Sequence, residues 1–209
     1  MSKQKWKSRH KCETFSSSCP KCNIVNSLKF ATQDEIENYI LNFIPERYIN
    51  AKPEDFPPSI TDVFSDPNES VYTCGGVGVG KTHLMACMGI VWLSYGESVL
   101  RVNYNSLLAE IKATFQDKSL NESTIYNKYS KCYRLIIEDV GTVSGHEKKE
   151  TEFNRSVIFR IINNRYENML PTYVTSNLSL NESATVFDER LTSRINSGRL
   201  IELSGKDRR

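Results

Sequence analysis

The chain has 209 residues, of which 39% are apolar and 10% aromatic, and this suits one globular domain with a small appendage. Lysine and arginine number 27 against 25 acidic residues, so the overall charge excludes no class of partner. No apolar run reaches the roughly 18 residues that a membrane span needs, and no apolar segment follows the basic start as in a secretory signal, so we expect a cytoplasmic protein without membrane contact.

Residues 1–30 form a basic segment that contains three of the six cysteines. Residues 1–22 have six lysine and arginine side chains against one glutamate, which favours contact with a polyanion, although basic chain ends are also often solvated tails. Crowded cysteines in so long a chain are more typical of metal binding in a reducing compartment than of a disulfide scaffold.

Four residues of this segment have the chemistry of zinc ligands, namely His10, Cys12, Cys19 and Cys22. The run from Cys19 to Cys22, "CPKC", resembles a zinc knuckle, and a tetrahedral site needs four such donors. A segment this short cannot fold on a core of its own, so a bound Zn²⁺ would have to stabilise it. The alternative is a disordered tail with incidental thiols.

Residues 31–67 are expected to link this segment to the main domain, which we predict at residues 68–209. In "DEIENYILNF", the residues Ile36, Tyr39, Ile40 and Phe43 follow the three- and four-residue spacing of a helix. The proline-rich stretch "IPERYINAKPEDFPPS" comes next.

From residue 70 onward, β-rich runs alternate with helical stretches. The predicted strands are residues 71–74, 99–102, 133–137, 172–175 and 200–203. The predicted helices are residues 81–95, 105–115, 152–167 and 188–196, and residues 117–131 are expected to combine a loop with a short helix. Apolar strands that alternate with helices predict an α/β fold, with a parallel sheet that helices cover on both faces.

The stretch "SVYTCGGVGVGKTHL" contains the pattern G-x-x-x-x-G-K-[ST] of a phosphate-binding loop, formed by Gly75, Gly76, Val77, Gly78, Val79, Gly80, Lys81 and Thr82. Successive backbone amides must wrap around a triphosphate, and side chains at the glycine positions would obstruct them. We expect Lys81 to reach the β- and γ-phosphates and Thr82 to bind Mg²⁺. A chance match in a glycine-rich turn would not explain the apolar strand before it and the helix after it. His83 is grouped with the nucleotide-binding residues, although a role at the helix start is more usual there.

A second strand, within "YRLIIEDVG", is predicted to bring carboxylates to the same place. Its apolar run ends in Glu138 and Asp139. One acid is expected to orient the water shell of the metal and the other to polarise the attacking water, whereas the alternative is a pair of solvated acids in a turn. Glu138 stands where such sites usually have aspartate, so the sequence leaves open which acid has which role.

Three polar residues further along are candidates for the same chemistry. Asn177, in "PTYVTSNLS", would hold a water near the γ-phosphate, although such an asparagine is more often a turn residue. Arg190 and Arg194, in "DERLTSRI", are four positions apart and so share one helical face. They are candidates either to reach the γ-phosphate of a neighbouring subunit or to form exposed ion pairs.

The ordered segments "IPERYINAKPEDF", "KTHLMACMGI", "GESVLRVNYNSLLAEIKATF", "LIIEDVG", "TSNLS", "ERLTSRI" and "LIELSGKDRR" resemble the DnaC/DnaI-type helicase loaders, a branch of the AAA+ ATPases. IstB-like transposition ATPases share much of the pattern. The resemblance covers residues 45–209 and implies an AAA+ fold, ATP and Mg²⁺ as ligands, Asn177 as sensor 1, and Arg190 or Arg194 as the arginine finger. With only about 45 residues before Pro45, it also indicates a version from a phage, a plasmid or a mobile element.

The resemblance therefore implies an ATPase that loads a replicative DNA helicase and contacts single-stranded DNA. We expect slow turnover that depends on DNA or on assembly into homo-oligomers. Two alternatives stay open, which are a transposition helper ATPase on duplex DNA and a nucleotide-dependent adaptor that does not hydrolyse ATP. Glu138, in the place of the usual aspartate, keeps the second alternative open.

Overall fold

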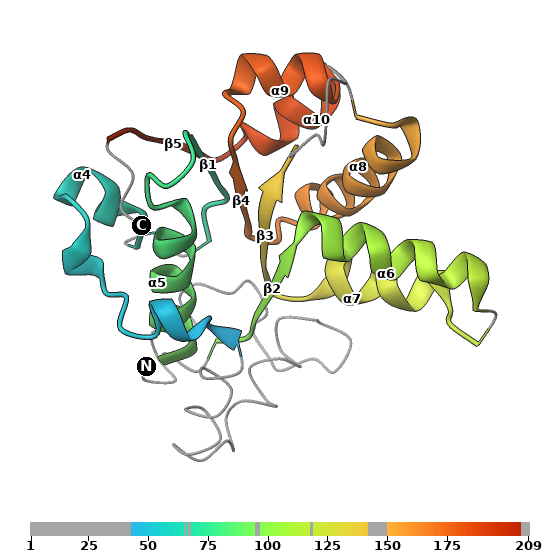
Figure 1. Ribbon diagram of the computed structural model, residues 1–209, viewed down its shortest axis with the longest axis horizontal. Coiled ribbons are helices and arrows are strands. Elements are labelled where there is room, and N and C mark those ends of the chain that lie inside the picture. The colour runs from blue at the N-terminus through green and yellow to red at the C-terminus, as the bar shows by residue number, and fades with distance from the viewer. Residues whose placement is uncertain are drawn as a thin grey trace.

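Five parallel strands form the centre of the molecule in this computed structural model, which describes residues 43–205 apart from residues 65, 67, 95–96, 118 and 142–149 (Figure 1). The strands are β1 (Val71–Gly75), β2 (Val99–Asn103), β3 (Arg134–Val140), β4 (Thr172–Ser176) and β5 (Arg199–Leu203). They lie in the order β2-β3-β4-β1-β5, and every neighbouring pair is parallel. The carboxyl ends of all five strands therefore lie along one edge of the sheet.

Helices connect the strands and cover both faces of the sheet (Figure 1). They are α5 (Lys81–Ser94), α6 (Tyr104–Gln116), α7 (Glu122–Lys131), α8 (Glu152–Glu167), α9 (Leu180–Val186) and α10 (Glu189–Ile195). Successive strand residues face opposite sides, so Leu135 and Ile137 pack with α6, α7 and α8, whereas Ile136 packs with α5. The predicted α/β fold with two covered faces is confirmed.

A leading segment, residues 43–64, packs against α5 on its face of the sheet. It contains η1 (Glu46–Tyr48), η2 (Pro53–Asp55), α4 (Pro58–Thr61) and η3 (Asp62–Phe64). Its buried side chains, Ile44, Ala51, Phe56 and Val63, share one core with α5. Gly89 allows this approach, because a Cβ atom there would lie 3.1 Å from a ring carbon of Phe43. These residues, predicted as part of a linker, are thus part of the folded body.

The structure differs from the sequence prediction mainly at element ends. Strand β3 continues to Val140, beyond the predicted end at residue 137, and α9 was not predicted. Helix α6 begins at Tyr104, because the side chain of Asn103 accepts a hydrogen bond from the Asn105 amide at 3.0 Å and caps the helix.

The predicted zinc ligands His10, Cys12, Cys19 and Cys22 and the first part of the predicted linker, residues 31–42, lie outside the described residues. Within the described ranges, no helix is long and apolar enough to cross a bilayer.

Candidate functional site

The loop between β1 and α5 has a backbone that only glycine fits well. Gly75 has a φ of 147°, and a Cβ atom there would lie 2.1 Å from the carbonyl oxygen of Leu203 in β5. Gly80, directly before α5, has a φ of 105°, where other residues are strained. The loop thus turns tightly from the strand into the helix, and the start of a helix after such a loop is a common anion site.

Lys81 places its ammonium group at the centre of this loop. The residue is only 7% exposed. Its Nζ donates hydrogen bonds to the carbonyl oxygens of Gly75 at 2.8 Å and Gly76 at 2.7 Å, and to Oδ1 of Asn177 at 2.7 Å. Because Asn177 follows β4, the neighbour of β1, the structure brings these two predicted residues together.

A hollow of about 350 Å³ opens beside Lys81, a volume within the range of small-molecule sites. Four parts of the chain line it, namely η1, the glycine loop with the start of α5, the last part of β3, and the turn after β4. The lining residues are Arg47, Tyr48, Val77, Gly78, Gly80, Lys81, Thr82, His83, Asp139 and Asn177. Most of the predicted phosphate-loop residues thus line the same pocket as Asp139 and Asn177, whereas Glu138 is not among the lining residues.

The two acids of β3 lie at an irregularity of the strand rather than after its end. The pairing of β3 with β4 shifts between Ile137 and Val140. Asp139 has a φ of 59°, and its backbone N–H donates to Oγ1 of Thr175 at 3.0 Å. Its carboxylate lines the hollow and accepts a hydrogen bond from Nδ2 of Asn103 at 3.1 Å. The predicted strand end at residue 137 is corrected, because the bond to Thr175 and the one from Oγ of Ser176 to the carbonyl oxygen of Val140, at 2.6 Å, hold β3 to β4 beyond this point.

Glu138 is buried, with 3% of its surface exposed, and it forms an ion pair with Arg101 of β2. The side chain of Thr82 also interacts with this carboxylate. Burial raises the pKa of Glu138 to about 7, with a further rise from the charge of Asp139, while Arg101 and Thr82 act in the opposite direction. Its Oε1 atom has no hydrogen-bond partner among the described residues.

These oxygen atoms fit the ligand preference of Mg²⁺. The ion prefers carboxylates, hydroxyls, water and phosphate oxygens, and it is commonly bound through one or two carboxylates and the phosphates of a substrate. An unpartnered buried oxygen of Glu138 beside Thr82, with Asp139 on the wall of the same hollow, supplies such a set.

His83 ties the leading segment to the start of α5. Its Nε2 lies 2.8 Å from Oδ2 of Asp55, and its ring lies 5.3 Å from that of Phe56 and 5.8 Å from that of Tyr48, centroid to centroid. The hydrogen bond from the Lys52 amide, followed by the contact with His83, lowers the pKa of Asp55. His83 therefore lines the hollow and also holds the segment that forms its outer wall.

The two candidate arginines lie outside this hollow, on α10. The guanidinium group of Arg190 lies 5.1 Å from the Phe159 ring centroid and 3.7 Å from a carboxylate oxygen of Asp188, and its side chain is 74% exposed. Arg194 lies over the same ring at 5.0 Å and donates to Oδ1 of Asn163. The structure thus brings neither arginine to the pocket of its own chain.

No site role followed from the sequence for five further residues. Arg47, Tyr48, Arg101, Asn103 and Thr175 lie in segments that carry the family resemblance, but only the structure shows that they reach the site, from η1, β2 and β4.

Comparison with known proteins shows where this fold and site occur. The family described as "IstB-like ATP binding protein" matches residues 23–204. The replicative helicase loader DnaC of Escherichia coli K12 is 27% identical over 124 residues, which are 59% of this chain and 49% of DnaC. The chromosomal replication initiator protein DnaA of Aliarcobacter butzleri is 31% identical over 128 residues, 61% of this chain and 27% of DnaA. The chain spans about half the length of DnaC and less of DnaA.

Solved structures show the same fold. A crystal structure of DnaI has a TM-score of 0.62 at 24% identity, covering 80% of this chain and 95% of that chain. A crystal structure of the DnaC helicase loader has a TM-score of 0.64 at 21% identity, and the match covers 77% of this chain and 100% of that chain. The structure of AMPPCP-bound DnaA from Aquifex aeolicus has a TM-score of 0.62 at 21% identity, and the match covers 78% of this chain and 51% of that chain. The predicted AAA+ fold and the resemblance to DnaC/DnaI-type and IstB-like proteins are confirmed.

The raised pKa of Glu138 predicts a pH-dependent cost of folding. Folding raises this pKa from 4.5 to about 7, so the folded protein holds the proton of Glu138 more tightly than the unfolded chain does. The folded state is therefore favoured most below pH 4.5, and this advantage is lost as the pH rises from 4.5 through 7. Glu138→Gln keeps an acceptor for Arg101 but cannot ionise. We expect its effect on the free energy of unfolding to be more stabilising at pH 8 than at pH 5 by about 2 to 3 kcal/mol, measured by urea unfolding without nucleotide or divalent metal.

Glu202→Gln, at an exposed glutamate of β5, is the matched control and should change the free energy of unfolding equally at both pH values. An equal effect of Glu138→Gln at pH 5 and pH 8 would contradict the burial of an ionisable Glu138.

Proposed function

We propose that this chain, which belongs to the IstB-like ATP-binding protein family, binds ATP in the hollow beside residues 75–82 and uses it to deliver a replicative DNA helicase to DNA. The observation that supports ATP most strongly is the position of Lys81, whose buried ammonium group is held between the glycine loop and Asn177. The helicase role is supported by the match to DnaC.

The residues of the hollow have distinct proposed roles towards ATP. The amides of the loop and of the start of α5 would bind the phosphates, since unpaired backbone N–H groups and the dipole at a helix start favour anions. Lys81 would exchange its bonds with Gly75, Gly76 and Asn177 for bonds with the β- and γ-phosphates. Asn177, once released, would orient a water molecule near the γ-phosphate.

The two acids are proposed to divide the remaining work. Glu138 lies beside Thr82, so these two would hold Mg²⁺, which would neutralise part of the phosphate charge. Asp139 lines the hollow, so it would accept a proton from the attacking water. Asn103 fixes the carboxylate of Asp139 in that direction.

Assembly with other copies is proposed to complete the site. Arg190 is the better candidate for the arginine finger because its side chain is 74% exposed, whereas Arg194 is engaged with Asn163. An arginine that reaches the γ-phosphate in another subunit would make slow turnover depend on assembly.

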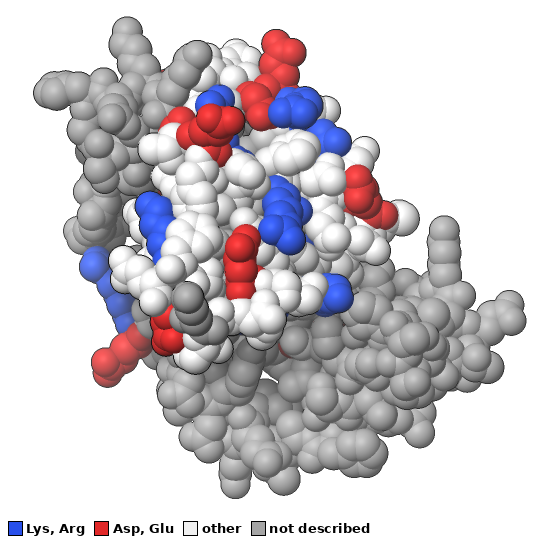
Figure 2. All heavy atoms as spheres, turned by 90° about the vertical axis from the view of Figure 1, so that its right-hand side faces the viewer, with Lys and Arg blue, Asp and Glu red and all other residues white. Residues whose placement is uncertain are grey.

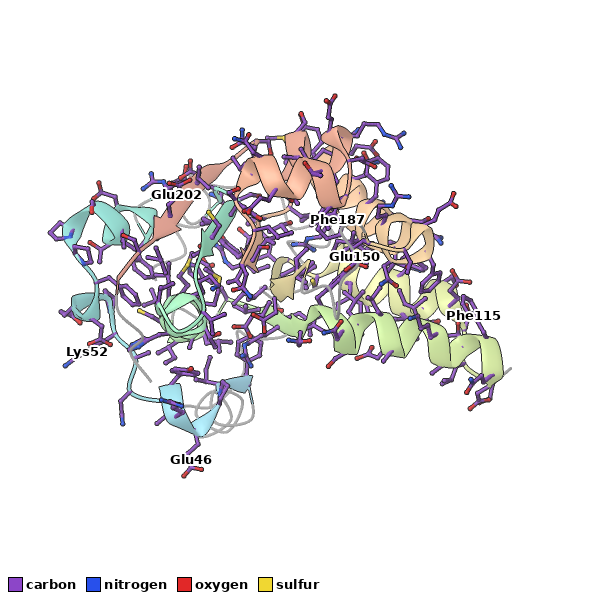
Figure 3. All side chains as sticks on the ribbon, turned by 45° about the horizontal axis from the view of Figure 1, so that its top comes forward. Glu46, Lys52, Phe115, Glu150, Phe187 and Glu202 are labelled. Carbon is purple, nitrogen blue, oxygen red and sulfur yellow. The ribbon has the colours of Figure 1, made fainter. Side chains whose placement is uncertain are left out.

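Single-stranded DNA has a candidate contact at the far end of α6. The aromatic side chains of Tyr104 and Tyr126 on α6 and α7 are buried, whereas Phe115 on α6 is 62% exposed. Its ring lies 5.7 Å from that of Phe153, and Nζ of Lys112 lies 5.5 Å from the Phe153 ring centroid. Exposed aromatic rings beside a cation are typical of single-strand binding. Figure 3 shows Phe115 at the right-hand end of the molecule, at the end opposite to Lys52.

The charges near this contact are mixed. Figure 2 views the molecule from the side on which α6, α7 and α8 project, and lysine, arginine and acidic side chains are interspersed there. Two of the ion pairs among these helices are Lys128 with Glu110 at 2.9 Å and Arg160 with Glu122 at 3.5 Å. Stacking on Phe115 would therefore supply more of the affinity than the attraction of phosphates to a basic surface.

A second candidate function, a transposition helper ATPase on duplex DNA, is favoured by the family match itself. The two functions differ in the preferred DNA. A loader should bind single-stranded DNA more tightly than duplex DNA and retain a helicase, whereas a transposition helper should assemble on duplex DNA. The affinities for the two forms of DNA should be measured over a series of salt concentrations, because contacts with phosphates make them depend on salt.

Replacement of Lys81 tests the nucleotide site. We expect Lys81→Ala to weaken ATP binding by about 10- to 100-fold, because charge-assisted hydrogen bonds to the phosphates are lost, as measured by calorimetry. Lys128→Ala, which removes an exposed lysine on α7, is the control. Helicase from the native host should co-purify with the wild-type protein in ATP but not with Lys81→Ala. Wild-type protein that binds ATP yet retains no helicase would exclude the loader role.

Replacement of Phe115 tests the DNA contact. We expect Phe115→Ala to weaken binding to a labelled oligo-dT by about tenfold in fluorescence anisotropy, because a stacking surface for one base is lost. Tyr166→Ala removes another exposed ring, on α8, and should leave the affinity unchanged. Equal losses for the two variants would show that Phe115 is not a specific contact.

A further inference from the structure

Arg101 is a charged residue of the site that belongs to no nucleotide-binding pattern. It lies in the middle of β2, and its guanidinium group forms an ion pair with the carboxylate of Glu138, which is 4% exposed at its side chain. Arg101 itself is only 20% exposed at its side chain. The strength of such a pair rises as water is excluded from it, so this contact is a strong constraint on Glu138.

The sheet register explains why these two residues meet. Arg101 pairs with Ile136, and Asn103 pairs with Glu138, so Arg101 and Glu138 are diagonal neighbours on the same face of two parallel strands. Diagonal neighbours lie about 7–8 Å apart at their backbones, within reach of long side chains only. An aspartate, the residue more usual at position 138 in such sites, is one methylene shorter than glutamate. The longer Glu138 is therefore matched to the arginine on β2.

The pair leaves each partner with one unmet hydrogen-bonding group. Oε1 of Glu138 and Nε of Arg101 are buried without a partner in the part of the chain that the structure describes. Glu138 therefore has one oxygen committed to Arg101 and one that is available to another ligand. The available oxygen belongs to a carboxylate that Thr82 also contacts.

A metal ion at Glu138 and Thr82 would share this carboxylate with Arg101. Two cations within a few ångströms of each other repel strongly where water is scarce. A carboxylate that already neutralises a guanidinium group also has less negative charge to offer to a second cation. Metal binding would therefore be weaker while Arg101 stays paired with Glu138.

We propose that Arg101 competes with Mg²⁺ for Glu138, so that ATP binding depends on a higher concentration of Mg²⁺ than it would without this arginine. The proposal rests on the proposed ATP site. Arg101 acts here as a positioning residue, because it sets the direction and the charge of Glu138 and does not itself touch the nucleotide.

The test measures how ATP affinity depends on Mg²⁺ in wild type and in Arg101→Met, at pH 8.5, where the wild-type carboxylate is ionised. Removal of the competing cation should lower the Mg²⁺ concentration that gives half of the gain in ATP affinity by about tenfold. Arg101→Lys keeps a positive charge and should stay closer to wild type. Arg199→Met is the control, since it removes an arginine at the start of β5 whose ion pair is with Glu69, away from Glu138.

Glu138→Asp keeps the test available if Arg101→Met does not fold. The shorter carboxylate should not reach Arg101, so its Mg²⁺ requirement should also fall. An unchanged or higher Mg²⁺ requirement in folded Arg101→Met would overturn the competition while leaving the ATP site intact. Wild-type protein that binds no ATP at any Mg²⁺ concentration would overturn the proposed function and this inference together.

Discussion

The ammonium group of Lys81 is buried, so it must be surrounded by oxygen atoms, and the rest of the site is arranged around that requirement. Two of its hydrogen-bond partners are carbonyl oxygens of the glycine loop, and a third is the amide oxygen of Asn177, 96 residues further along the chain. Because β1 lies beside β4 and all strands are parallel, the loop after one strand meets the turn after the other. The open edge of the sheet, where the strands end, is the usual position for a ligand in such folds.

Much of this could be predicted from the sequence, because its signals are local. The glycine loop has fixed residue types at fixed spacing, and the strands are short apolar runs between helices. The acids followed from their place after Leu135, Ile136 and Ile137. The extension of β3 to Val140 could not be predicted, since it depends on a φ of 59° at Asp139 and on the hydroxyl of Thr175 in another strand.

The contacts that the sequence did not show are single pairs between distant elements. Arg101 with Glu138 and His83 with Asp55 join residues 37 and 28 positions apart, with no repeating pattern around them. Arg165 is another example, since it is fully buried in α8 and donates to carbonyl oxygens of Tyr129, Cys132 and Pro171. A helical arginine ordinarily indicates a solvent-exposed face, and only the packed structure shows the carbonyl groups that it satisfies.

Two parts of the structure outside the glycine loop affect the nucleotide site, namely the leading segment and the pair formed by Glu138 and Arg101. Residues 43–64 pack on the helix that starts at Lys81 and supply Arg47 and Tyr48 to the wall of the hollow, so any movement of this segment would alter the nucleotide site. Glu138, the proposed metal ligand, is already paired with a cation of the protein, Arg101. Both features connect nucleotide binding to parts of the chain outside the glycine loop.

The most direct test of the account is a crystal structure with a non-hydrolysable ATP analogue. It should place the β- and γ-phosphates against the amides of residues 76–82, with Nζ of Lys81 on a phosphate oxygen instead of on Asn177. An analogue bound elsewhere on the protein, or an ammonium group of Lys81 still held by Gly75, Gly76 and Asn177 beside a bound triphosphate, would contradict it.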